Sequence, residues 1–124
     1  MDHMIGALNR EYGLDIEDYA VYGDVSGKIG RYTVLLESPV PDVRRIDEFC
    51  NTAEKVLSDE NPYYGSLVRD RVLDRMRLMF VRPGTFAEYR ERIIAGGTLS
   101  NQIKPVRMLN TPERKEFFLS RVMM

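Results

Sequence analysis

The sequence has one cysteine among its 124 residues, no long apolar run and no long run of one charge. A single cysteine cannot form a disulfide within the chain. No apolar stretch reaches the roughly 20 residues that a membrane-spanning helix needs, and the start lacks a signal-peptide pattern. The formal net charge is -1, so no global basic surface indicates nucleic acid or an anionic membrane as a partner. These absences predict a cytoplasmic protein that binds neither nucleic acid nor membrane.

What is present indicates one domain over residues 1–124. Hydrophobic residues make up 44% of the chain, which is enough for a core, and no repeat, linker or low-complexity segment divides it. Hydrophobic spacing predicts the elements of the first half of the chain. They are a helix over 4–12 ended by Gly13, strands over 16–24 and 30–38 that form an antiparallel hairpin, a helix over 43–57 and a shorter helical segment over 61–71.

The second half begins with the continuous apolar run Leu78-Met79-Phe80-Val81, which suits a strand covered on both faces. We expect this strand at the centre of the sheet. Thr85 and Glu88 have capping-box spacing at the start of a helix that Gly96 and Gly97 end. A short strand over 106–109 and a last helix that begins at Thr111-Pro112 follow. This order predicts an α+β domain, a two-layer sandwich with a small mixed, mainly antiparallel sheet packed by helices.

The most informative segment is the polar loop that runs from Gly96 to Arg107. It presents an amide at Gln102, an ammonium at Lys104 and a guanidinium at Arg107, and these groups suit a phosphoryl or acyl-adenylate anion. Pro105 biases Lys104 toward an extended backbone. Spacing alone favours an ordinary solvated lysine and a salt-bridging arginine over an anion-binding pair.

Other candidate groups have structural interpretations. Cys50 lies on the apolar stripe of its helix, which predicts a buried structural thiol and not a nucleophile. Scattered acidic residues lack metal-ligand spacing, so no metal site is expected in this chain. Two adjacent tyrosines, Tyr63 and Tyr64, stand near Arg69 and Arg71, but we expect their rings to pack on the sheet and not on bases.

The ordered combination of blocks resembles the carboxy-terminal domain of the acyl-acid amido synthetases, the plant auxin- and jasmonate-conjugating family that also has bacterial members. The resemblance extends from about Ile5 to Val122. Its blocks are Tyr22-Gly23-Asp24 through Gly30-Arg31-Tyr32 to Glu37, Asn61-Pro62-Tyr63-Tyr64, Val81-Arg82-Pro83-Gly84-Thr85-Phe86, and Asn101-Gln102-Ile103-Lys104 with Pro105 and Arg107. The family pattern places a residue between lysine and proline, whereas Pro105 directly follows Lys104 here; the spacing from lysine to arginine is the same.

The resemblance implies a part in a two-step ligase that uses ATP and magnesium to convert a carboxylic acid into an acyl-adenylate and then joins the acyl group to an amino acid. The domain would close over a large N-terminal adenylation domain of the parent chain. Lys104 matches the lysine expected to approach the adenylate, Gln102 would orient the loop, and Arg107 would pair with a carboxylate or brace the loop. The chain would bind no cofactor and would not catalyse the reaction alone.

The competing hypothesis is a stand-alone binding or regulatory module without chemistry. It is motivated by the absence of a complete set of catalytic residues in this sequence. Adenylate binding by the isolated chain would favour the module, whereas acid-dependent ATP–pyrophosphate exchange by a longer parent protein would favour the ligase domain.

Overall fold

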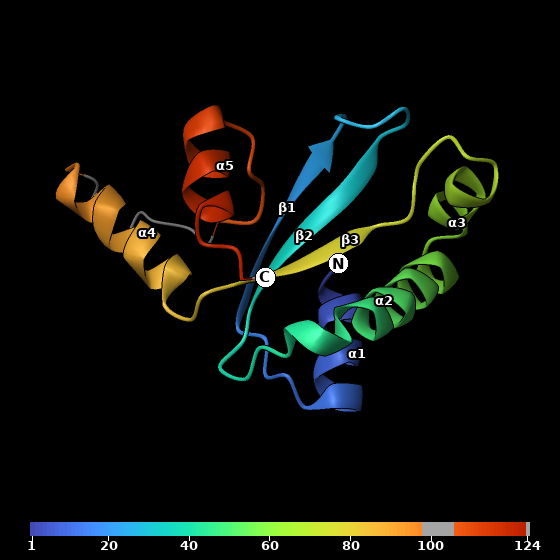
Figure 1. Cartoon of the computed structure of the whole chain (residues 1–124), viewed down its shortest axis with the longest axis horizontal. Coiled ribbons are helices and arrows are strands. Elements are labelled where there is room, and N and C mark those ends of the chain that lie inside the picture. The colour runs from blue at the N-terminus through green and yellow to red at the C-terminus, as the bar shows by residue number, and fades with distance from the viewer. Residues whose placement is uncertain (98–105, 124) are drawn as a thin grey trace.

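The computed structural model describes residues 1–97 and 106–123, and Figure 1 shows a small sheet with helices on both sides. The elements follow the predicted order except for one short strand. They are α1 (Asp2–Tyr12), β1 (Asp18–Asp24), β2 (Arg31–Glu37), the 3-10 turn η1 (Val43–Arg45), α2 (Ile46–Glu60), α3 (Pro62–Arg69), β3 (Arg77–Val81), α4 (Thr85–Ala95) and α5 (Pro112–Leu119). The predictions of an α+β fold and of a mixed sheet are confirmed.

The sheet has the order β1-β2-β3. β1 and β2 pair antiparallel as the expected hairpin, with Asp18 opposite Glu37, and β2 and β3 pair parallel through a helical connection. The prediction that the apolar run 78–81 occupies the centre of the sheet is wrong, because β2 does. The outer edge of β3 is covered instead by the C-terminal segment, where the Met123 N–H donates to the Phe80 carbonyl at 2.8 Å. This cover explains why residues 78–81 of an edge strand are all apolar.

Strand alternation divides the core between the two faces of the sheet. On one face, Val34 and Leu36 of β2 pack with α1, α2 and α3. On the other face, Leu35 packs with Phe86 of α4 and Phe118 of α5. The predicted helix layer is therefore shared between both faces, with α4 and α5 on their own side (Figure 1).

Helix ends follow the local sequence with one exception. Asn61 caps α3, Thr111 caps α5, and Gly13 and Gly97 supply left-handed backbone at φ 65° and 104° after α1 and α4. The capping box predicted at Thr85 is wrong. Gly84 is the N-cap of α4, and the Thr85 hydroxyl donates to the Arg82 carbonyl.

The segment 106–109 forms a single bridge between Met108 and Val21, not the short strand that was predicted. None of the helices in the described part of the chain could cross a membrane.

Candidate functional site

The candidate site is the region around the predicted anion-binding loop. Gln102 and Lys104 lie outside the described residues, so their roles stay predictions. Arg107 is described, and it lies at the outer edge of β1. Its backbone carbonyl accepts the Val21 N–H at 2.8 Å, and the Leu109 N–H donates to the Val21 carbonyl at 3.0 Å. The chain that leaves the loop is therefore attached to the sheet.

The Arg107 side chain is held by groups of β1. Its Nη1 lies 3.3 Å from Asp18 Oδ1 and 3.4 Å from the Tyr19 carbonyl, and its guanidinium carbon lies 4.5 Å from the centre of the Tyr19 ring. A partly exposed ion pair of this kind contributes at most about 1 kcal/mol to stability. These contacts orient the Arg107 guanidinium more than they stabilise the fold. They also mean that the guanidinium already has partners within this domain.

Tyr19 connects this arginine to the start of α1. Its hydroxyl donates to Asp2, and its ring lies under the Arg107 guanidinium. Burial raises the pKa of the Tyr19 phenol, and the hydrogen bond to Asp2 raises it further, while Arg107 lowers it. The phenol is therefore a neutral donor at physiological pH.

Glu37 fixes the start of α4 at the same corner of the sheet. Its Oε1 accepts the Phe86 N–H at 3.0 Å, so a carboxyl group from β2 takes the place of a local cap at the helix N-terminus. Burial raises the pKa of Glu37, the Phe86 hydrogen bond opposes that rise, and Asp18 adds to it. Because Asp18 faces Glu37 in the strand register, one pair of neighbouring acids holds both α4 and Arg107. Sequence reasoning missed this pairing, since it depends on which strand ends meet.

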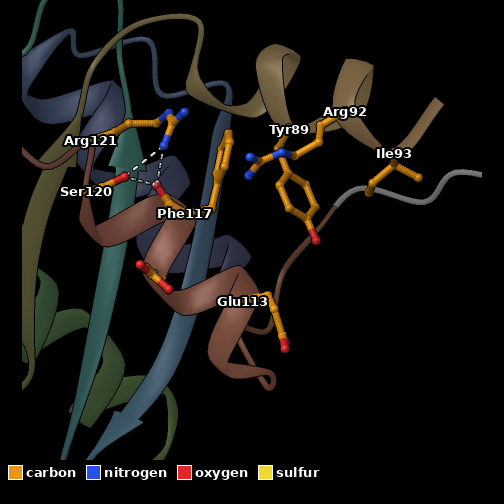
Figure 2. Close-up of a pocket in the computed structure, with 8 residues that line it drawn as sticks. Tyr89, Arg92, Ile93, Glu113, Phe117, Ser120 and Arg121 are labelled. Carbon is orange, nitrogen blue, oxygen red and sulfur yellow. Dashed lines mark hydrogen bonds between the residues drawn. The ribbon is translucent and has the colours of Figure 1, made fainter. Parts of the chain in front are cut away.

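A groove of about 620 Å³ lies between α4 and α5. Figure 2 shows Tyr89 and Arg92 of α4 facing Phe117 of α5, with Arg121 just beyond the end of that helix. The Arg92 and Arg121 guanidinium carbons lie 5.2 Å and 3.6 Å from the centre of the Phe117 ring. Arg121 also forms a two-pronged ion pair with Glu88, at 2.9 Å and 3.0 Å. These contacts bind the two helices to each other.

Among residues 1–97 and 106–123, no group of three or more histidine, cysteine or acidic side chains could hold a metal ion. Cys50 is half-buried against the core of the α1–α3 face, and burial raises the pKa of its thiol. A raised pKa disfavours the reactive thiolate, in agreement with a structural residue. Of the adjacent tyrosines, Tyr64 packs on the sheet as expected, but Tyr63 is 72% exposed and does not.

The chain is thus an α+β domain in which β1 and β2 hold both sides of the predicted loop. Glu37 of β2 holds α4, which precedes the loop, and Asp18 of β1 holds Arg107 at its end. The chain belongs to the GH3 family: the family's C-terminal domain matches residues 2–113. The family resemblance seen in the sequence is thus confirmed.

The relatives reported below are much longer than the chain. Indole-3-acetic acid-amido synthetase GH3.8 of Oryza sativa subsp. indica is 28% identical over 123 residues, which cover 94% of this chain and 20% of that protein. Two solved structures share the fold at 22% identity and cover 99% of this chain: GH3.15 acyl acid amido synthetase, with a TM-score of 0.82, and AtGH3.15 acyl acid amido synthetase in complex with 2,4-DB, with a TM-score of 0.79. The chain spans 22% and 24% of those two proteins, about the share it spans of the rice enzyme.

Proposed function

We propose that this chain is the C-terminal domain of a cytoplasmic, ATP-dependent acyl acid amido synthetase. The observation that carries the proposal is the match of the family's C-terminal domain to residues 2–113, together with a relative named as an indole-3-acetic acid-amido synthetase. In the proposed reaction a carboxylate oxygen attacks the α-phosphorus of ATP and pyrophosphate leaves. The amino group of an amino acid then attacks the acyl carbon, loses a proton, and AMP leaves.

The proposed role of this domain is to close over an acyl-adenylate site in a large N-terminal domain. Lys104 would bring a positive charge to the oxygens on which negative charge develops, and Gln102 would orient the loop. Arg107 would brace the chain after the loop, which its contacts with Asp18 and Tyr19 support. The domain alone would not complete the reaction.

ATP and Mg²⁺ would be bound outside the described part of this chain. The oxygen-rich donor set that Mg²⁺ requires is not gathered among those residues, and the Arg107 fork already faces Asp18. This domain would therefore supply charge and closure, while the large domain would supply the ATP and metal site.

The test uses the full-length parent protein and measures acid-dependent ATP–pyrophosphate exchange and amide formation. We expect Lys104→Ala to lower at least one rate by roughly 100-fold or more, as removal of a group that stabilises transition-state charge does. Lys28→Ala is the matched control, because Lys28 is exposed in the turn between β1 and β2. Unchanged rates in Lys104→Ala would contradict the role of Lys104. A parent protein that shows no exchange with any carboxylic acid would contradict the ligase function.

A further inference from the structure

A second hollow lies where α2, α3 and the first residues of β2 meet, at the end of the molecule away from α4 (Figure 1). Its volume is about 260 Å³. We name it the tyrosine groove; the lining residues that matter here are Met1, Tyr32, Leu57, Tyr63, Tyr64 and Leu73. The groove takes no part in the reaction proposed above.

The floor of the tyrosine groove is preformed. The buried Tyr64 hydroxyl donates to Glu54 Oε2 at 2.9 Å, and its ring centre lies 6.2 Å from that of Tyr32. α2 and α3 also pack closely, since a Cβ at Gly65 would lie 3.2 Å from the Ser58 Cβ. A rigid floor lowers the entropy cost of binding.

The rim of the groove carries exposed aromatic surface. Tyr63 is 72% exposed and Tyr32 40% exposed, although both belong to regular elements. Successive helix residues point about 100° apart, which allows Tyr63 to face outward while Tyr64 faces the core. Tyrosine is enriched at the centres of protein interfaces. Arg31 and Asp74, which adjoin the lining residues Tyr32 and Leu73 in the sequence, form an ion pair with each other. Their charges are therefore already neutralised, which favours an apolar occupant of the groove over a charged one.

The family layout identifies the occupant. The chain matches a C-terminal domain and covers only 20% of the rice relative, so in a parent protein of that layout the large domain precedes residue 2. Met1 lines the groove and α1 begins at Asp2, so the connection from the large domain would enter beside Tyr63. A tethered segment has a high effective concentration at such a site.

We propose that the tyrosine groove binds an apolar side chain of the segment that connects the large N-terminal domain to α1. This inference rests on the proposed function for the existence of that segment. It makes the groove the place where the connection is attached to this domain, independent of any chemistry at Lys104.

The first test places a photo-crosslinking phenylalanine analogue at position 63 of the full-length protein. The matched control position is Val40, an exposed apolar residue (55%) beyond the other end of β2. We expect position 63 to crosslink within the same molecule to the residues that directly precede Met1, and position 40 not to reach them. Crosslinks from position 63 only to a second copy or to a distant part of the large domain would overturn the inference. A protein whose translation starts at Met1 would also overturn it.

The second test measures protease cleavage of the connecting segment. Tyr63→Ser should raise the cleavage rate roughly tenfold by releasing the segment, because tyrosine is enriched among the few residues that dominate binding at an interface. Val40→Ser should leave the rate unchanged. Equal rates in the two variants would contradict the proposal. Neither test needs ATP or an acid. A negative result here would therefore contradict the groove proposal even if the parent protein shows pyrophosphate exchange, and a positive result would stand even if it shows none.

Discussion

Tyr64 and Tyr63 offer a matched pair of substitutions, since they are neighbours in α3 with opposite surroundings. Tyr64 is buried, and its hydroxyl donates to Glu54 Oε2 at 2.9 Å. The Met76 N–H donates to the same oxygen at 3.0 Å, and Oε1 of Glu54 has no hydrogen-bond partner among the described residues. Tyr64→Phe therefore removes one of the two donors to a buried carboxyl group, while the ring stays in the core.

The expected loss follows from that arrangement. Removal of one partner from a buried polar group costs about 1–3 kcal/mol, and we expect a value near 2 kcal/mol because Oε1 has no bond to offset the loss. The change leaves no cavity beyond one oxygen. Tyr63→Phe should change the free energy of unfolding by less than about 0.5 kcal/mol, since Tyr63 is 72% exposed.

Urea unfolding followed by circular dichroism measures both variants. With a slope of about 2 kcal/mol per molar, Tyr64→Phe should lower the midpoint by about 1 M and Tyr63→Phe by no more than about 0.2 M. In a double-mutant cycle, Tyr64→Phe should cost less in the Glu54→Gln background than in the wild type. Equal midpoints for the two tyrosine variants, or full additivity with Glu54→Gln, would refute the argument from burial.

Three further predictions concern stability. Burial raises the pKa of Glu37 above its ordinary 4.5, so the folded state holds this proton more tightly than the unfolded state. The stability of the wild type relative to Glu37→Gln should therefore fall as the pH rises through 4.5 and the raised pKa, and a difference independent of pH would contradict this. Gly84→Ala should lower the free energy of unfolding by about 1–2 kcal/mol, because Gly84 has φ 92°, whereas Gly23→Ala in β1 should not lower it by a comparable amount. Thr111→Ala should lower the free energy of unfolding, measured by chemical denaturation, by about 1 kcal/mol, because it removes the hydroxyl that accepts the Arg114 N–H at the start of α5. Thr111→Ser should retain most of that stability, and equal losses in the two variants would show that the cap does not act through its hydroxyl.

Part of the candidate site could be predicted from sequence order alone. The helix before the loop, its end near Gly96 and Gly97 and the family resemblance all followed from short-range patterns and block order. The anchors of the site could not be predicted in this way. Glu37 lies near the end of a predicted strand. The strand register places it opposite Asp18, and the parallel pairing of β2 with β3 brings the Phe86 N–H within its reach.

The sequence by itself determined the fold class and every helix and strand except the short strand expected over 106–109. Hydrophobic periodicity, the caps at Asn61 and Thr111 and the glycine stops all act within a few residues. Apart from the β1–β2 hairpin, tertiary structure alone decided which partner each element meets. It put β2 and not β3 at the centre, divided the helices between the two faces and replaced the expected cap at Thr85 by Glu37. Those outcomes depend on contacts between residues distant in the sequence, and no local pattern encodes them.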